Sequence, residues 1–324
     1  MIMGKRSIPS LKKLVRIIKN SQRIVIATHI DPDCDGISAA IACAHLVKHY
    51  RKMPILFCPS SIPEKYHFLS GTWKFTRIIT DFDLLIVVDS PMISRILPDR
   101  ASGYLTAKKI INIDHHRSND AFGNLQIIDG TASSSCEIVY RIFKQLHIRI
   151  SKSLAEILYC GIYGDTGGFV YPNTTKESLR VAGELVALGV KPNPLVKKLN
   201  AKTLVGTLLL SQVLNTIAIK GVVGYMYITQ NMLKKNHARM FDSENFISFL
   251  QAIDGVRVSI FLREEEDGTR VSLRSDGIID VDEVAREYGG GGHRLAAGIR
   301  MKKNMATAKK EVLRTVLRRL QRGT

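Results

Sequence analysis

The first half of the chain alternates short apolar runs with segments of helical periodicity. The runs that we interpret as strands are RIVIAT (23–28), PILFC (54–58), DLLIVVDS (83–90) and KIINID (109–114). Helical patterns occupy residues 37–50, 133–146 and 153–165, and a serine is the expected N-cap of the second. Strands that alternate with helices predict an α/β fold with a parallel sheet, whose functional sites lie outside the carboxyl ends of the strands.

The pattern changes at KPNPLVKKLNAKTL (191–204), where two prolines within three residues indicate a boundary followed by a connecting helix. The second-half segments typical of strands are GVVGYMYITQ (221–230), VRVSIFLREEEDGTRVSLRSDG (256–277) and GHRLAAGIRM (292–301). The Asp-Gly pair in EEEDGT predicts a hairpin turn. We therefore expect a first domain over 1–190, a connector over 191–212 and a smaller α+β domain over 213–324.

Ionisable side chains follow the ends of the first-half elements. They are His29, Asp33 and Asp35 after the first strand, Asp89 after DLLIVVD, Asp114, His115 and His116 at the end of IINID, and Asp165 after a helix. Because the carboxyl ends of parallel strands meet at one edge of a sheet, we expect these side chains to be neighbours.

Carboxylates this close would raise one another's pKa, and divalent cations would relieve the conflict. Four carboxylates balance two such ions, and two imidazoles add neutral nitrogen ligands. This mixed ligation favours Mn²⁺, with Mg²⁺, Co²⁺ or Fe²⁺ as alternatives. Two metals about 3.5–4 Å apart would clamp a phosphoryl group. Each motif alone has a structural alternative, such as a helix cap or simple packing, so the prediction depends on their joint placement.

The motifs HIDPDCD (29–35), VVDS (87–90), IDHH (113–116) and GDTGGF (164–169) occur in the order found in the DHH phosphoesterase superfamily, which the chain resembles. That superfamily includes the RecJ exonucleases and manganese-dependent inorganic pyrophosphatases. YGGGGHRLAAG (288–298) resembles the signature of its C-terminal DHHA1 domain. With SLRS (272–275), the whole chain is similar to the branch of short-oligoribonucleases (nanoRNases) and pAp phosphatases. The resemblance implies a DHH domain, a DHHA1 domain and an active site in the interdomain cleft.

The metal ligands that the resemblance implies are His29, Asp33 and Asp89 for one ion, and Asp35, Asp89, His115 and Asp165 for the other. Asp114 would orient a neighbouring histidine, and His116 would stabilise charge on the scissile phosphate. A hydroxide between the metals would be the nucleophile, so no serine or cysteine nucleophile is needed. Cys34 and Gly168 depart from the family, which often has glycine and arginine there, and leave the substrate preference open.

The run GGGGH (289–293) predicts a place where backbone approaches an anion closely, because four glycines lose much conformational entropy on folding. The substrate-binding residues expected here and in SLRS are Arg274, Ser275, Gly290, Gly291, Gly292 and His293. The structural alternative is a tight turn packed against the preceding helical segment, VDEVAREY (281–288).

The 47 Lys and Arg against 29 Asp and Glu give a net charge of +18, which favours a polyanionic partner. A basic proteome or simple solubility explains the charge equally well. None of the five cysteines forms a C-x-x-C pair, and no apolar stretch approaches the roughly 18 residues that span a membrane. The basic N-terminus reads as an amphipathic helix and not as a signal peptide, which predicts a cytoplasmic protein without a membrane partner.

The strand-end residues predict a two-metal phosphoesterase. The resemblance implies that it cuts short oligoribonucleotides to nucleoside 5′-monophosphates, with pAp as a second candidate substrate. One alternative is a phosphodiesterase for linear or cyclic dinucleotides. An alternative of another class is a non-catalytic nucleic-acid-binding protein, although an intact ligand set argues against it. An inorganic pyrophosphatase is disfavoured by the glycine-rich domain. A homodimer is an open alternative for which no residue argues.

Overall fold

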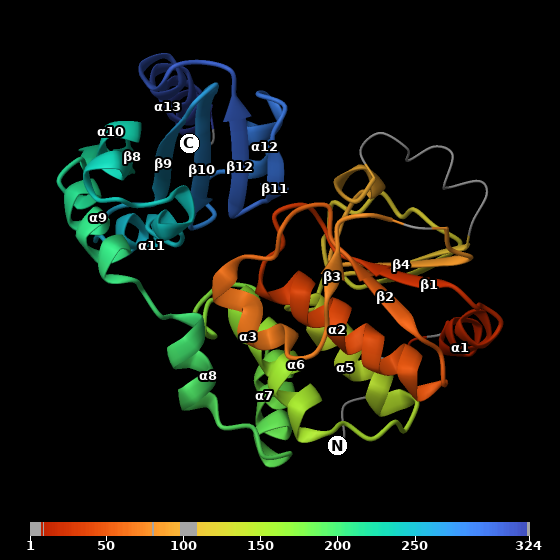
Figure 1. The fold of residues 1–324 in the computed structure, drawn as a ribbon. Helices are drawn as coiled ribbons and strands as arrows, with labels where there is room; N and C mark the ends of the chain where they lie inside the picture. The colour runs from red at the N-terminus through yellow and green to blue at the C-terminus, as the bar shows by residue number, and fades with distance from the viewer. Residues whose placement is uncertain (1–7, 9, 80, 98–108, 323–324) are drawn as a thin grey trace. The chain divides into compact units, whose positions relative to one another are not determined.

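The computed structural model describes residues 8, 10–79, 81–97 and 109–322, and the chain divides into two compact units, Met1–Ala201 and Lys202–Thr324. Figure 1 shows both units as ribbons. The division falls within the 191–212 segment, after its first helix. Within the described ranges, no helix combines the length and apolar character needed to cross a membrane.

The first unit contains a sheet of six parallel strands in the order β3-β2-β1-β4-β5-β6. Its elements are α1 (Leu11–Lys19), β1 (Ile24–Ala27), α2 (Cys34–His49), β2 (Pro54–Phe57), η1 (Glu64–Tyr66), α3 (His67–Ser70), β3 (Phe75–Thr76), β4 (Leu84–Val88), η2 (Ile93–Arg95), β5 (Lys109–Asp114), β6 (Leu125–Ile128), α5 (Ser135–Gln145), α6 (Lys152–Asp165), α7 (Lys176–Ala187) and α8 (Pro192–Leu199). The expected parallel sheet is confirmed. The expected N-terminal helix appears as α1, while residues 1–7 and 9 of that segment lie outside the described residues.

Both faces of this sheet are covered, which explains its apolar strand sequences. All five residues of β4 are buried. Ile24 and Ile86 belong to one core with residues of α2, α5 and α6, whereas Val25 and Val87 belong to a second core with residues near η2. Successive side chains of a strand point to opposite faces, so a strand covered on both sides must be apolar throughout. Figure 1 shows α2, α5 and α6 together on one side of the sheet.

The second unit contains a mixed sheet in the order β11-β12-β10-β9-β8-β7, in which only the β8–β9 pair is parallel among the described pairings. Its elements are α9 (Leu204–Leu214), β7 (Ala218–Lys220), β8 (Val223–Ile228), α10 (Gln230–Lys235), η3 (Met240–Ser243), α11 (Ile247–Gln251), β9 (Val258–Glu265), β10 (Gly268–Ser275), α12 (Val281–Arg286), β11 (Gly291–His293), β12 (Ala296–Met301) and α13 (Met305–Arg322). The expected smaller α+β unit is confirmed.

Two details of this unit differ from expectation. Glu265 pairs with Gly268, so the hairpin loop is Glu266 and Asp267, and the glycine belongs to the ladder. A Cβ at Gly268 would lie 2.1 Å from the carbonyl oxygen of Met301, which explains why glycine is needed there. The segment GHRLAAGIRM, expected as one strand, forms two antiparallel strands, β11 and β12, because the chain reverses between His293 and Ala296.

Candidate metal centre

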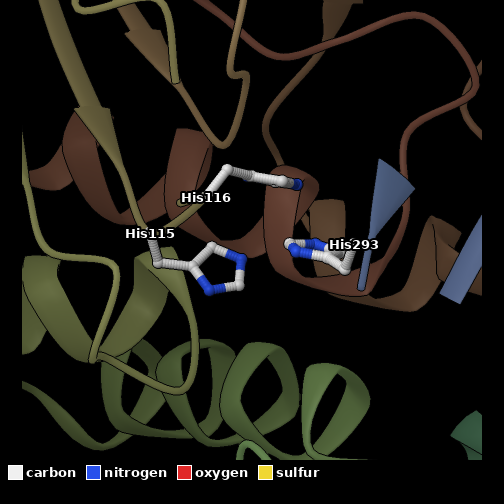
Figure 2. A group of neighbouring side chains, drawn as sticks. All are labelled: His115, His116 and His293. Carbon is white, nitrogen blue, oxygen red and sulfur yellow. The ribbon is translucent and has the colours of Figure 1, made fainter. Parts of the chain in front are cut away.

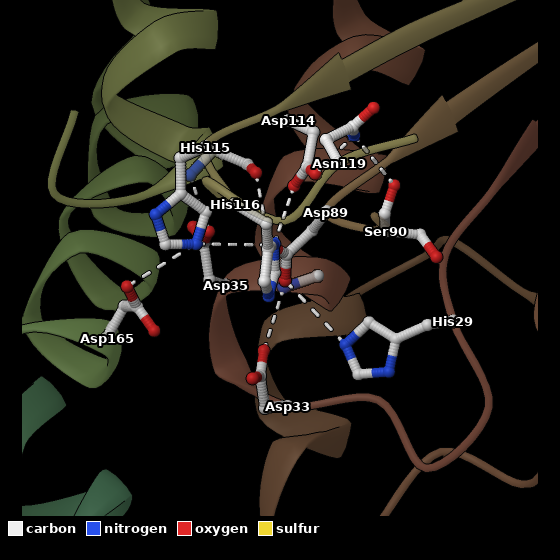
Figure 3. A network of polar contacts seen from close by, with 12 residues as sticks. His29, Asp33, Asp35, Asp89, Ser90, Asp114, His115, His116, Asn119 and Asp165 are labelled. Carbon is white, nitrogen blue, oxygen red and sulfur yellow. Dashed lines mark hydrogen bonds and ion pairs between the residues drawn. The ribbon is translucent and has the colours of Figure 1, made fainter. Parts of the chain in front are cut away.

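Four element ends of the first unit bring the expected ligands together (Figure 3). Their positions are His29 two residues after β1, Asp33 at the N-cap and Asp35 in the first turn of α2, Asp89 directly after β4, Asp114 at the end of β5 with His115 and His116 following, and Asp165 at the end of α6. Residues more than a hundred positions apart thus become neighbours because of the parallel topology.

Asp89 lies at the centre of this group and is 2% exposed. Its Oδ2 lies 3.7 Å from Nε2 of His29, and its Oδ1 lies 3.4 Å from Nε2 of His115. Among the described residues of the first unit, three groups have donor atoms within 4.8 Å of one another and could hold a metal ion, and all three include Asp89. They are His29, Asp33 and Asp89; Asp35, Asp89 and His115; and Asp89, Asp114 and His116.

Asp35 is held by the N-terminus of α5. Its carboxylate accepts hydrogen bonds from the backbone N–H of Ser135 at 2.6 Å and of Cys136 at 3.0 Å. Ser134 caps this helix, and the hydroxyl of Ser135 donates to Oδ1 of Asp89 at 3.1 Å. Helix N-termini stabilise negative charge, so α5 positions both carboxylates. Sequence reasoning identified the serine cap but missed this contact with the site.

The buried carboxylates oppose one another electrostatically. Burial, followed by the charges of Asp89 and Asp165, raises the pKa of Asp35 well above its usual value. Burial also raises the pKa of Asp165 to about 7. Burial alone would raise the pKa of Asp89, but hydrogen bonds with His115 and His29 outweigh it and hold that pKa well below its usual range. The group therefore needs protons or cations to compensate its negative charge.

The two consecutive histidines have different surroundings, although their ring centroids lie only 4.8 Å apart (Figure 2). Nε2 of His115 lies between Asp89 and Asp165, at 3.4 and 3.6 Å. Burial lowers the pKa of His115, but the charges of Asp165 and Asp89 outweigh it and raise that pKa well above the usual value. His116 instead places Nδ1 2.7 Å from Asp114, which is fully buried.

Several polar residues that sequence reasoning missed support these ligands. Asn119 donates to Asp114 at 2.6 Å, and Asn173 donates to Asp165 at 3.1 Å. Nδ1 of His29 lies 2.8 Å from the carbonyl oxygen of Ile30 and 3.1 Å from a guanidinium nitrogen of Arg95. No local sequence pattern indicated these partners, because each contact depends on tertiary structure.

The second unit contains the residues expected to bind substrate. The guanidinium of Arg274 folds back onto its own strand, where it donates to the carbonyl oxygen of Leu273 at 2.9 Å. Ser275 is 5% exposed and its hydroxyl accepts from the N–H of Gly277 at 3.0 Å. His293 is the last residue of β11 and is partly buried.

The glycine segment 289–292 is shaped by its own sheet. A Cβ at Gly290 would lie 2.2 Å from the carbonyl of Gly298, and one at Gly292 would lie 2.4 Å from that of Ala296. The N–H of Gly292 donates to Asp282 at 2.7 Å. A Cβ at Gly291, in contrast, would meet nothing closer than Asp282 at 3.6 Å. The close backbone approach that these glycines permit is therefore, at two positions, an approach to β12.

Sequence comparison identifies two family domains at these positions. The DHH family N-terminal domain matches residues 23–162, and the DHHA1 domain matches residues 220–322. The bifunctional oligoribonuclease and PAP phosphatase NrnA of Thermus thermophilus is 32% identical over 304 residues, covering 93% of this chain and 91% of that relative. The chain belongs to the DHH family.

Two further proteins are similar to this DHH chain, one in sequence and one in structure. The bifunctional oligoribonuclease and PAP phosphatase NrnA of Bacillus subtilis is 29% identical over 290 residues, covering 88% of this chain and 91% of that protein. The crystal structure of an exopolyphosphatase-related protein from Bacteroides fragilis matches with a TM-score of 0.88 at 24% identity, covering 99% of this chain and 98% of the other. The structural match shows that the two chains share their fold.

Proposed function

We propose that this DHH chain is a metal-dependent phosphoesterase that hydrolyses short oligoribonucleotides to nucleoside 5′-monophosphates and removes the 3′-phosphate of pAp. The observation that carries the proposal is the set of overlapping donor groups that share Asp89. Membership of the DHH family and the printed activities of its relatives support the choice of substrates.

The donor set fits two divalent cations. Four carboxylates would neutralise four positive charges. Burial raises the pKa of Asp35 and of Asp165, which supports compensation by cations. His29, Asp33 and Asp89 would hold one ion, and Asp35, Asp89, His115 and Asp165 would hold the other. Oxygen and imidazole ligands suit Mn²⁺, with Mg²⁺ or Co²⁺ as alternatives. When bound, such ions polarise a phosphoryl oxygen and lower the pKa of water.

His116 is the proposed catalytic residue of the protein itself. A carboxylate accepts hydrogen bonds but donates none, so Nδ1 of His116 must donate to Asp114. That contact fixes the ring and leaves Nε2 for the scissile phosphate or its leaving oxygen. With a second proton on Nε2, the ring would donate a hydrogen bond there and stabilise negative charge as it develops. Asp114 acts as a positioning residue, held in turn by Asn119.

Substrate recognition would come from the second unit. The residues proposed for it are Arg274, Ser275, Gly290, Gly291, Gly292 and His293. Of the three glycines proposed here, Gly291 has the most open surroundings, since a Cβ there would meet only Asp282 at 3.6 Å. The N–H of Gly292 is already bonded to Asp282. Arg274 supplies a cation that suits a phosphate.

The test is a substrate panel with Mn²⁺ or EDTA, comparing RNA 2-mers, 5-mers and 24-mers, pAp, pApA and pyrophosphate. Asp89→Asn should reduce turnover of the 2-mer and 5-mer by about 100-fold or more, because it weakens every donor group at once. Asp120→Asn is the control, since that side chain is exposed and belongs to none of the donor groups. Turnover that survives EDTA and Asp89→Asn would contradict the proposal.

The same panel separates the alternatives. Cleavage confined to pApA would leave the metal centre in place and indicate a dinucleotide phosphodiesterase. Tight, strongly salt-dependent binding of the 24-mer without any turnover would indicate a nucleic-acid-binding protein instead.

A further inference from the structure

A row of three arginines crosses the sheet of the second unit. Arg263 on β9 is directly paired with Arg270 on β10, and Arg270 is directly paired with Arg300 on β12. Directly paired residues point to the same face of a sheet. The residues one step along, Leu262, Val271 and Ile299, belong to the core that includes α12 and α13, so the arginines lie on the opposite face.

The charge of this row is only partly compensated. Arg300 forms an ion pair with Glu265 at 2.9 Å. Among the described residues, neither Arg263 nor Arg270 has a carboxylate within ion-pair distance. Like charges directly opposite each other on neighbouring strands are destabilising, so two unpaired arginines at paired positions call for a compensating anion.

Arg263 is the unusual member, because it is only 9% exposed. One terminal nitrogen donates to the hydroxyl of Ser272 at 2.6 Å, and its guanidinium lies 5.3 Å from the ring centre of Phe261. Its Nε is buried without any hydrogen-bond partner. A buried charge with an unsatisfied donor is strongly unfavourable unless something binds it.

Arg263 stays protonated and positively charged in these surroundings. Burial and the neighbouring charges of Arg270 and Arg274 lower its pKa to about 10, while Glu265 and Glu244 raise it. A pKa of about 10 still keeps the guanidinium protonated at neutral pH. Glu265 is already paired with Arg300, so its negative charge is shared between two arginines.

We propose that Arg263, Arg270 and Ser272 form a phosphate-binding site on this face of the second unit. A guanidinium presents parallel N–H donors that match two oxygens of a phosphate, and a hydroxyl can donate to a third. The site shares no residue with those proposed above for substrate recognition, although Arg274 follows Ser272 by two positions on β10 and its charge acts on Arg263. It does not depend on turnover at the metal centre.

The test measures phosphate binding by the full-length protein in EDTA, so that hydrolysis plays no part. Inorganic phosphate, 5′-AMP and an RNA 5-mer are titrated by calorimetry against wild type, Arg263→Gln and Arg270→Gln. Each variant should bind about 10- to 100-fold more weakly, because it loses hydrogen bonds between charged groups. The control is Arg257→Gln, which removes an exposed arginine already paired with Asp276 at 2.7 Å and should leave affinity within about twofold.

A second readout separates binding from packing. Without phosphate, Arg263→Gln should unfold at an equal or higher temperature than wild type, because an uncompensated buried charge is removed. A lower unfolding temperature with unchanged affinity for all three ligands would overturn the proposal. Arg263→Gln could fail to fold, and Arg270→Gln then provides the test, because Arg270 is less buried. Unchanged phosphate affinity in Arg270→Gln would overturn the proposal. Weakening with all three ligands supports a site for any phosphate, and weakening with the 5-mer alone supports one for the phosphodiester backbone.

Discussion

Asp114 illustrates how a buried carboxylate can act through its neighbour. Burial alone would raise its pKa, but hydrogen bonds from His116 and Asn119 outweigh burial and hold that pKa below its usual range. The side chain is therefore an anion at neutral pH, and it accepts the Nδ1 proton of His116. The orientation and the tautomer of that histidine follow from a residue that would never touch the substrate.

Replacing Asp114 by Asn should lower kcat by about 10- to 100-fold, because an amide can no longer fix the tautomer of His116. Steady-state kinetics across pH 5–9 checks this, since the variant should also shift the profile. Asp129→Asn is a suitable comparison. It removes a carboxylate bonded to Arg141 at 2.7 Å outside the donor groups, so it should change stability and not the pH profile.

The titration of Asp165 and His115 predicts how the metal-free protein responds to pH. The pKa of Asp165 is raised to about 7 and that of His115 is also raised, so the folded state binds both protons more tightly than the unfolded state. Stability is then present at low pH and lost as pH rises through these folded values. We expect the free energy of unfolding in EDTA to fall by roughly 2–4 kcal/mol between pH 5 and pH 8.

Urea denaturation at the two pH values provides the measurement, and Asp165→Asn should make the difference smaller. Saturating Mn²⁺ should reverse the trend, since the ion replaces the protons. A metal-free protein that is more stable at pH 8 than at pH 5 would show that these two groups do not dominate.

Helices α2, α5 and α6 pack closely at glycines of α6, and Gly161 makes the tightest of these contacts. A Cβ at Gly161 of α6 would lie 2.3 Å from Sγ of Cys136 and 3.0 Å from Oδ1 of Asp35. The contact joins α6 to α5 and to the first turn of α2, the turn that carries a proposed ligand. Cys34 is also part of this packing, since its thiol donates to the carbonyl of Cys160 at 3.1 Å.

Gly161→Ala should therefore destabilise the protein by about 1–3 kcal/mol, although alanine normally favours helix over glycine. Gly183→Ala in α7 is the matched control. No atom lies within 4 Å of a Cβ at that position, so it should stabilise the protein by about 0.4–1 kcal/mol. Chemical denaturation measures both changes. Equal effects of the two substitutions would mean that the Gly161 contact relaxes freely.

Sequence periodicity predicts elements well where burial alone determines them. The segments around β1, β4 and β5 are apolar runs, and their strands appear where expected. Helix α2 begins at Cys34, three residues before the apolar pattern, because Asp33 caps it by accepting from the N–H of Gly36. Parallel topology also made the convergence of the strand-end residues predictable.

Other features depend on contacts that no local pattern contains. The N–H groups of Ser135 and Cys136 reach Asp35 from a hundred residues away. The reversal between β11 and β12 has no glycine or proline at Arg294 or Leu295 to indicate it. Gly168 has a φ of +74°, a conformation that glycine adopts more readily than arginine, so its departure from the family pattern has a local backbone reason.

At the scale of the whole molecule, the chain forms two units with separate cores. The cores of the first unit contain helix and strand residues from the segment α1 to α8. The cores of the second unit contain helix and strand residues from the segment α9 to α13. The six proposed metal ligands, together with Asp114 and His116, all belong to the first unit. The arginine row belongs to the second.

Binding of Mn²⁺ should accordingly protect the first unit from hydrogen exchange. At about 100 times its dissociation constant, a ligand adds about 2.7 kcal/mol, so amides of β4, β5 and the start of α2 should exchange up to about 100-fold more slowly. Mass spectrometry of peptides with and without metal makes the measurement, and Asp89→Asn is the control. A gain of equal size in β9 and β10 would contradict this assignment of the metals.

The backbone of Asp89 has a consequence for how such a protein could lose its activity in evolution. Its φ is +55°, in the left-handed region that Asn, Asp and Gly tolerate better than other residues. Most substitutions there would therefore carry two penalties, one in ligation and one in backbone strain. A lineage that abandons hydrolysis but keeps the fold would therefore pass most easily through asparagine or glycine at this position.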